Sequence, residues 1–204
     1  MIDVNKFLNY PTGNLCNASP QVQVLPSAIK PLIAGMRIAG RAKTVRITPG
    51  QNAAIHRAVH AAKPGDILVV DGAGSDRFGP FGDLLAENAQ RNGIVGAVFD
   101  CTVRDSADIR DLGFQVFCRG FHPEATAKHD PGEVDIDLTI GRARICPGDI
   151  LVGDDDGVVV IPVAIALDVL TRVALVQDKE IEIRARIQAG ESTFDIFDLS
   201  KSEE

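Results

Sequence analysis

The sequence predicts an α/β fold with a long C-terminal helix, and three features of the 204-residue chain support that prediction. Apolar, β-branched runs alternate with segments of helical period through the first half of the chain. Short strands separated by turn signals follow, and a long helical pattern comes last. Such alternation is typical of α/β domains but does not define the strand order. We expect a single domain over residues 1–204, with a core at about 35–162 and a helical arm at about 163–190.

The first half of the chain contains the alternating elements. A short helix near the N-terminus precedes a loop that is rich in proline, asparagine and serine. Pro64 with Gly65, and Asn92 with Gly93, are the signals that end the next two helices. The glycines at the end of the second strand predict a tight loop after it. The expected strands lie at 35–47, 66–74, 94–100 and 114–120, and the expected helices at 50–66, 82–93 and 106–113.

The second half has shorter strands and one long helix. Asp156-Gly157 between two β-type runs is a strong hairpin signal. Pro162 suits a position near the first turn of the last helix, whose pattern continues to Gly190. A helix of this length at the end of a small domain often packs against a neighbouring subunit. The expected strands of this half lie at 134–140, 143–153 and 157–162.

The composition argues against nucleic-acid and membrane partners. The chain has 28 acidic and 21 basic residues, a net charge of -7, and no basic run that offsets this charge locally. Such a surface repels a phosphate backbone. No apolar stretch approaches the roughly 20 residues that span a bilayer, and the first residues lack the charged and then apolar order of a secretory signal. We expect a cytoplasmic protein with no nucleic-acid and no membrane partner.

The four cysteines are expected to be reduced thiols. They lie far apart and form no C-x-x-C pair, so neither a zinc knuckle nor a redox pair is indicated. Catalysis by Cys101 is conceivable from its neighbours, but a packing role is favoured. The cysteines are Cys16, Cys101, Cys118 and Cys146.

Three other motifs have simple structural interpretations. The glycine-rich stretch at 71–79 fails the dinucleotide fingerprint, because Arg77 stands where the third glycine belongs. His56 and His60 are one helical turn apart, as in some metal sites, but no acidic residue beside His56 supports one. The aspartates at 154–156 are explained by a hairpin turn with surface carboxylates.

The segment from Gly82 to Asp108 combines several functional signals. Gly82-Asp83-Leu84-Leu85 opens a helix, whose free N–H groups and positive dipole end can bind a carboxylate or phosphate. The next strand delivers Arg104 and Asp105 at its carboxyl end, where ligands commonly bind in α/β sheets. We therefore expect the helix start and the strand end to face one cleft.

The residue types in this segment indicate a chemistry. Arg104 offers a planar fork to a carboxylate or keto oxygen, and Asp105 offers a hard oxygen ligand for magnesium or manganese. Together they could bind a 2-oxo acid on a metal ion and stabilise an enolate. The alternative is a surface Arg-Asp pair in which Asp105 caps the next helix, and the pair alone favours that alternative.

The sequence resembles the RraA-like family, which contains the class II 4-hydroxy-4-methyl-2-oxoglutarate aldolases and the regulator of ribonuclease E activity. The stretch "GDLLAENAQRNGIVGAVFDCTVRDSADIRDLGFQVFCRG" carries the resemblance. The flanking stretches "KPGDILVVDGAG" and "PGDILVGDDDGVVVIP" match other recurring parts of the family. The resemblance covers about residues 35 to 190, and it is the combination of stretches that is specific.

The resemblance implies a metal-dependent lyase with a swivelling β/β/α domain. Members of the aldolase branch cleave a 4-hydroxy-2-oxo acid to pyruvate and a second 2-oxo acid, and they commonly decarboxylate oxaloacetate. The implied cofactor is a divalent cation, Mg2+ or Mn2+, and the implied ligand is a small 2-oxo acid.

The same resemblance implies a role for each residue of the motif. Asp105 would be the metal ligand and Arg104 the catalytic substrate clamp, while the backbone amides around Gly82, Leu84 and Leu85 would bind the substrate carboxylate. The resemblance also implies roles for three acidic residues. Asp83 would bind substrate and order water or assist proton transfer, Asp108 would support the metal ligand, and Glu180 of a neighbouring subunit would complete the site.

The family's assembly, a homotrimer or a hexamer formed by two trimers, is also implied. Two functional alternatives remain beside the aldolase. One is a non-enzymatic protein that binds an RNA-degrading endonuclease, although that branch is expected to lack the acid after the arginine. The other is an enzyme for a different oxo or hydroxy acid, because Cys101 stands where the family usually has glycine.

Overall fold

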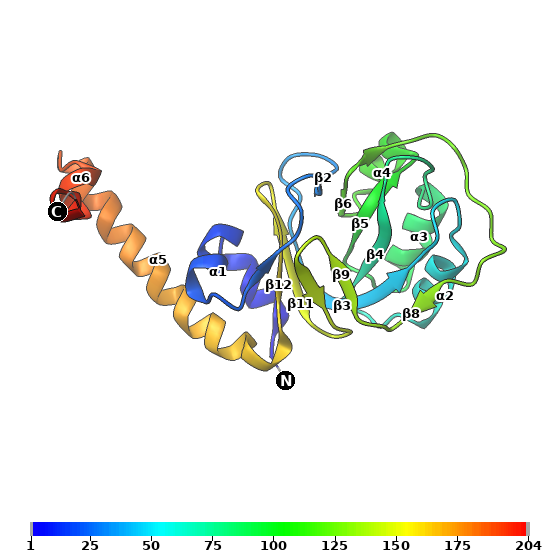
Figure 1. The fold of residues 1–204 in the computed structure, drawn as a ribbon, viewed down its shortest axis with the longest axis horizontal. Coiled ribbons are helices and arrows are strands. Elements are labelled where there is room, and N and C mark those ends of the chain that lie inside the picture. The colour runs from blue at the N-terminus through cyan, green and yellow to red at the C-terminus, as the bar shows by residue number, and fades with distance from the viewer. Residues whose placement is uncertain (1, 203–204) are drawn as a thin grey trace.

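The computed structural model describes residues 2–202 and has an α/β fold with a long C-terminal helix (Figure 1). A ten-stranded sheet has the order β1-β12-β11-β3-β4-β5-β6-β2, with β7 paired to β5 and β8 to β3. A two-stranded sheet is formed by β9 (Leu138–Ile140) and β10 (Ala143–Ile145). The strands of the large sheet are β1 (Gln23–Val24), β2 (Lys30–Pro31), β3 (Ile38–Arg46), β4 (Asp66–Ser75), β5 (Gly96–Val103), β6 (Val116–Cys118), β7 (Gly120–Phe121), β8 (Glu133–Val134), β11 (Ile150–Asp154) and β12 (Gly157–Ile161).

Helices flank the large sheet, and further helical elements lie toward both ends of the chain. The structure confirms the three helices predicted between the central strands and the long helix predicted after Pro162. One short helix was predicted near the N-terminus, where the structure has a 3-10 turn followed by an α-helix. The helical elements are η1 (Val4–Asn9), α1 (Thr12–Ala18), α2 (Ala53–Ala61), α3 (Asp83–Arg91), α4 (Ser106–Leu112), η2 (Val163–Ile165), α5 (Ala166–Gln188), α6 (Thr193–Ile196) and η3 (Leu199–Ser202).

The centre of the sheet is parallel, with β3, β4, β5 and β6 paired in that order. The antiparallel hairpin of β11 and β12 extends it beside β3. Successive residues of β4 pack on opposite faces, because side chains alternate along a strand. Leu68 and Val70 join the cluster covered by α2, α3 and α4, whereas Ile67 and Val69 face the cluster covered by β9 and β10. Along the chain, α3 follows β4 and α4 follows β5. The carboxyl ends of these parallel strands are therefore connected to the starts of the two helices.

The end of β4 agrees with the sequence prediction to within one residue. The strand expected at 66–74 includes the glycines, and β4 extends to Ser75, although its pairing with β5 shifts register between Val70 and Ser75. A Cβ atom at Gly72 would lie 2.7 Å from Cβ and 2.8 Å from Sγ of Cys101 on β5. Glycine is therefore required here by the close approach of a neighbouring side chain.

Cys101 packs inside the protein. Its side chain is 1% exposed and belongs to the helix-covered cluster. Burial is the main cause that raises the pKa of its thiol, and the nearby Asp100 carboxylate adds to the effect. All four cysteines are free, and Cys101 occupies the space that Gly72 leaves open. The packing interpretation of Cys101 agrees with this environment.

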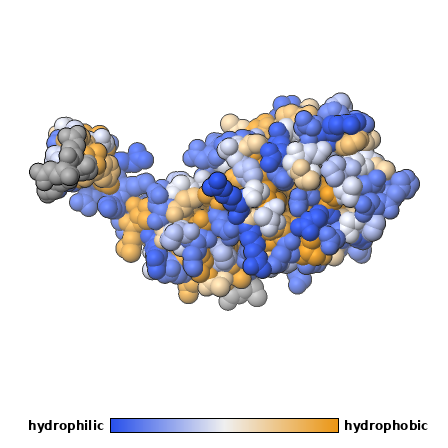
Figure 2. Space-filling view, in the orientation of Figure 1, coloured by the Kyte–Doolittle hydropathy of each residue, from blue (hydrophilic) through white to orange (hydrophobic). Residues whose placement is uncertain are grey.

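The C-terminal helix extends away from the sheet. In Figure 1, α5 begins near β12 and runs away on the side opposite α3 and α4. Only Ala166, Val169 and Val173 are buried in it, and they pack with α1 and the β11–β12 hairpin. Figure 2 shows apolar side chains among polar ones along this arm, and Leu175 and Ile181 are more than 60% exposed. Within residues 2–202, no helix is long and apolar enough to cross a membrane.

The contact between Gly72 and Cys101 predicts a coupled effect on stability. Gly72→Ala should lower the free energy of unfolding by about 1–3 kcal/mol, because a methyl group is forced into a close-packed layer. Gly72→Ala combined with Cys101→Gly should be less destabilising than the sum of the two single changes by about 0.5–3 kcal/mol. Urea unfolding measures both quantities. Gly13→Ala is the control, since a Cβ there meets nothing within 4 Å, and additive effects of the paired changes would contradict the contact.

Candidate active site

Arg104 and Asp105 lie at the carboxyl end of β5, directly before α4. Asp105 has a φ of 53° and a ψ of 40°, a left-handed conformation that aspartate tolerates better than most side chains. Its carbonyl accepts the first hydrogen bond of α4, from Ile109 N over 3.0 Å, but its side chain caps nothing. The capping role considered for the Asp105 carboxylate is therefore wrong, and that carboxylate is turned to another partner.

That partner is the start of α3. A Cβ atom at Gly82 would lie 2.2 Å from Oδ2 of Asp105 and 3.1 Å from Nε of Arg104. A Cβ at Gly79 would lie 2.5 Å from Cβ of Arg104, and Arg104 N donates to Phe81 O over 2.9 Å. Two glycines thus allow the segment before α3 to lie directly on the Arg-Asp pair. The structure brings together the helix start and the strand end.

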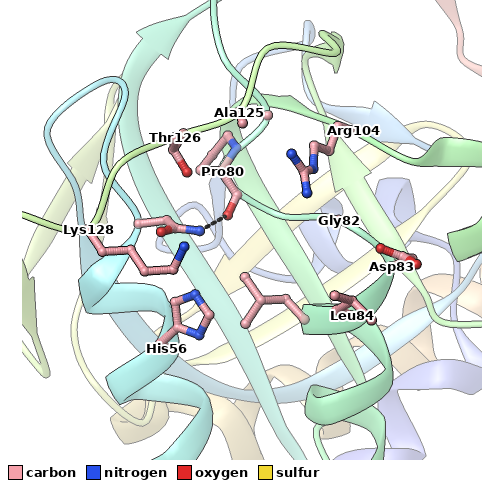
Figure 3. Close-up of a pocket in the computed structure, with 12 residues that line it drawn as sticks. His56, Pro80, Gly82, Asp83, Leu84, Arg104, Ala125, Thr126 and Lys128 are labelled. Carbon is pink, nitrogen blue, oxygen red and sulfur yellow. Dashed lines mark hydrogen bonds between the residues drawn. The ribbon is translucent and has the colours of Figure 1, made fainter.

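Arg104 and Asp105 form an ion pair at this contact. Nε of Arg104 donates to Oδ2 of Asp105 over 3.1 Å, and both side chains are about one-third exposed, at 35% and 32%. The terminal nitrogens of Arg104 bond no other described residue, and Figure 3 shows its guanidinium directed into the cavity before α3. The fork of Arg104 and the second oxygen of Asp105 are therefore available to a ligand.

A cavity of about 190 Å³ lies between the starts of α2 and α3. In Figure 3, His56 and Lys128 lie across this cavity from Arg104 and Asp83. Both helix starts direct free N–H groups and the positive ends of their dipoles to this region, which favours an anion. The lining residues are Asn52, His56, Gly79, Pro80, Gly82, Asp83, Leu84, Leu85, Arg104, Ala125, Thr126 and Lys128.

Two lining residues have unusual environments. Partial burial, and then the Lys128 ammonium, lower the pKa of His56, so its imidazole is neutral at pH 7. Asn52 donates from Nδ2 to Pro80 O over 3.0 Å, while its Oδ1 is buried without a hydrogen-bond partner among the described residues. An unpaired buried acceptor is costly and suits a ligand that carries a hydroxyl donor.

A second cavity of about 350 Å³ lies on the other side of Arg104. Asp105 and Asp108 both line it, whereas Asp83 lines only the first cavity. Arg104 is common to both. The residues that line the second cavity are Arg104, Asp105, Ser106, Ala107, Asp108, Phe121, His122 and Pro123.

The residues around Asp105 fit a hydrated magnesium-type ion. No group of three histidine, cysteine or acidic side chains in the described part of the chain could enclose a metal. One carboxylate with a free oxygen, in a partly open position, is the protein contribution that Mg²⁺ commonly accepts, since it retains several waters. A closed zinc site would need more ligands than this.

Glu180 and His60 line neither cavity, whereas three residues that were not predicted as site residues line the first one. Glu180 accepts a hydrogen bond from Asn14 Nδ2 over 3.2 Å on the arm, away from the site of its own chain. His60 does not line either cavity, so His56 reaches the site alone. Sequence reasoning missed Asn52, His56 and Lys128 as parts of the site. Lys128 lies in an irregular segment that carries no periodic signal, whereas Asn52 lies in the first turn of the helix expected at 50–66.

Comparison with known proteins identifies the family. The sequence profile described as "RraA-like: Aldolase/RraA" matches residues 12–160. A relative from Halalkalibacterium halodurans, named as a putative 4-hydroxy-4-methyl-2-oxoglutarate aldolase, is 36% identical over 159 residues, which cover 78% of this chain and 76% of the relative.

Two solved structures have similar folds. The RNA-processing inhibitor RraA from Thermus thermophilus has a TM-score of 0.70 at 32% identity, covering 74% of this chain and 92% of that one. Streptomyces coelicolor RraAS2, described as an unusual member of the RNase ES inhibitor RraA family, has a TM-score of 0.78 at 26% identity, covering 91% and 96%. The sequence profile, the similar relative and the similar folds agree, and the chain belongs to the RraA-like family.

Proposed function

We propose that this protein is a divalent-metal-dependent pyruvate aldolase of class II, a lyase. Its substrate would be a 4-hydroxy-2-oxo acid such as 4-hydroxy-4-methyl-2-oxoglutarate, cleaved to pyruvate and a second 2-oxo acid. Oxaloacetate decarboxylation would be a side activity. The observation that supports this most strongly is the Asp105 carboxylate, which lies against Gly82 and beside Arg104 and has one oxygen without a hydrogen bond to any described residue.

The first cavity would bind the anionic substrate. Backbone N–H groups at Gly82, Asp83, Leu84 and Leu85 belong to the first turn of α3, where no intrahelical acceptors exist for them. They would take the substrate carboxylate, and the free nitrogens of Arg104 would take the adjacent keto oxygen. The cationic Lys128 across the cavity supports a substrate with a second carboxylate.

The acidic residues would serve the metal and the proton. Asp105 would hold Mg²⁺ or Mn²⁺, which when bound supplies Lewis-acid stabilisation of the negative charge that develops on the keto oxygen. Asp83, in the first cavity, would carry a proton at its carboxylate during cleavage. Asp108 would orient Asp105 or its water from the second cavity.

The assembly and location are part of the same proposal. Beside the site, Leu84 is 74% exposed and Phe121 is 54% exposed, which suits contact with a second subunit. A homotrimer or hexamer would cover them, and Glu180 of a neighbour would approach the site. We assign the protein to the cytoplasm as one domain over residues 1–204, without a nucleic-acid or membrane partner.

The alternative function is binding to an RNA-degrading endonuclease. It is favoured by the two structural relatives that are described as inhibitors of RNA processing. A regulator needs neither the free oxygen of Asp105 nor the cavity at α3. Metal-dependent turnover, which depends on both, distinguishes the two functions.

Asp105→Asn should abolish metal-stimulated pyruvate release, with a loss of at least about 100-fold in kcat, because the metal loses its anionic ligand. A coupled assay of pyruvate measures the loss. Asp111→Asn is the matched control. Asp111 lies on α4, the helix that directly follows Asp105, and its side chain is 79% exposed. Full pyruvate release by the Asp105 variant would refute the proposed metal role.

Removal of divalent ions should stop turnover of oxaloacetate and of 4-hydroxy-2-oxo acids. A chelator is expected to eliminate pyruvate release, and added Mg²⁺ or Mn²⁺ is expected to restore it. The proposed reaction requires a Lewis acid, and Asp105 and Arg104 alone do not supply one. A panel of 2-oxo acids also identifies the preferred substrate. Equal rates with and without chelator would exclude metal-dependent catalysis.

Gly82→Ala should weaken metal binding while the fold persists. The added methyl group takes the position of Asp105 Oδ2, and that carboxylate can rotate away at small cost. The metal affinity measured by calorimetry should fall about 10–100-fold, as it does when a metal ligand loses its support. Unchanged affinity would show that the contact between Gly82 and Asp105 does not position the ligand, and Gly13→Ala again provides the control.

A further inference from the structure

His122 connects the two loops that form the wall between the cavities. It follows β7, and its Nδ1 accepts hydrogen bonds from Phe78 N and from Glu124 N, each over 3.2 Å. One acceptor thus joins the loop before α3 to the loop after β7. The ring also lines the cavity that contains Asp105.

The loop before α3 needs this attachment. Phe78 has a φ of +70°, a left-handed conformation that is unfavourable for a bulky side chain. Its carbonyl accepts from Thr102 Oγ1 over 2.7 Å, and the following Gly79 N donates to Glu124 O over 2.7 Å. The strained peptide is therefore fixed on its N–H side by His122 and on its carbonyl side by Thr102.

The same loop continues into the site. A Cβ at Gly79 would lie 2.5 Å from Cβ of Arg104 and 2.7 Å from His122 O, so loop, arginine and histidine are in close contact. Three residues later the chain reaches Gly82, which lies against Asp105. A shift of the Phe78 peptide would therefore move the surface on which the Arg-Asp pair rests.

The hydrogen bonds define the state of the imidazole. Two N–H donors on Nδ1 require a lone pair there, so the neutral ring carries its proton on Nε2. Nε2 has no hydrogen-bond partner among the described residues. With Nδ1 occupied and Nε2 already protonated, His122 is not suited to accept a proton from a substrate.

We propose that His122 is a positioning residue of the active site: its Nδ1 holds the loop from Phe78 to Gly82, and thereby the wall on which Arg104 and Asp105 are aligned. This inference rests on the proposed function for its effect on catalysis. The hydrogen bonds themselves are independent of that function and can be tested without turnover.

The first test uses the wild-type protein and no substrate. ¹⁵N NMR of the imidazole at pH 7 should show a protonated Nε2 and an unprotonated Nδ1 for His122. The backbone amides of Phe78 and Glu124 should exchange slowly with solvent, and His122→Leu should accelerate the exchange of both. A protonated Nδ1, or unchanged exchange in His122→Leu, would overturn the positioning role whether or not the protein is an aldolase.

The second test measures catalysis by three variants. His122→Leu should lower kcat about 10–100-fold, the loss expected when reacting groups are misplaced by up to 1 Å, and leave KM close to the wild-type value. His122→Asn keeps an acceptor near the Nδ1 position and should recover most of the lost kcat. His129→Asn is the matched control, because His129 is an exposed histidine of the same loop that lines neither cavity.

The outcomes of the second test are distinct from failure of the proposed function. If Asn and Leu at position 122 impair kcat equally while the fold is intact, the acceptor role of Nδ1 is refuted. If the wild-type protein has no aldolase activity, the proposed function fails, and the NMR measurements alone then decide the positioning role.

Discussion

The site depends on one close approach, that of the chain before α3 to the chain after β5. Gly82 lies so near Asp105 that a Cβ would be 2.2 Å from the carboxylate, and Gly79 is as close to the stem of Arg104. The bond from Arg104 N to Phe81 O fixes the two segments at this separation. A side chain at either glycine would have to displace the Arg-Asp pair or the chain before α3. The absence of two Cβ atoms is therefore as important to the site as the charged groups.

This approach also organises the charges. The starts of α2 and α3, with Lys128, make the first cavity favourable to anions, while Asp105 and Asp108 make the second favourable to cations. Arg104 lines both cavities, and its bond to Asp105 connects them. The ion pair of Arg104 and Asp105 thus lies between a cavity that favours anions and a cavity that favours cations.

Cys101, at the position where the resemblance to the family led us to expect glycine, is explained by the sheet and not by the site. Its side chain points into the helix-covered core and fills the space beside Gly72 on the adjacent strand. Because the thiol is 1% exposed and lines neither cavity, this substitution is a matter of packing between β4 and β5. His56 and Phe121, by contrast, do line the cavities.

Local patterns were enough to predict the order and type of the main helices and strands and the positions of Arg104, Asp105 and the start of α3, because period, turn residues and strand ends are local properties of the chain. They did not reveal that the pairing of β4 with β5 shifts register between Val70 and Ser75, since register depends on the partner strand. Nor did they reveal that Asn52, His56, Lys128 and His122 gather around the same cavities. Those residues come from the start of α2, which precedes the motif by some thirty residues, and from the irregular loop that follows the motif. Only tertiary packing decides their proximity, because contacts between distant segments are set by how the layers of the fold close over one another.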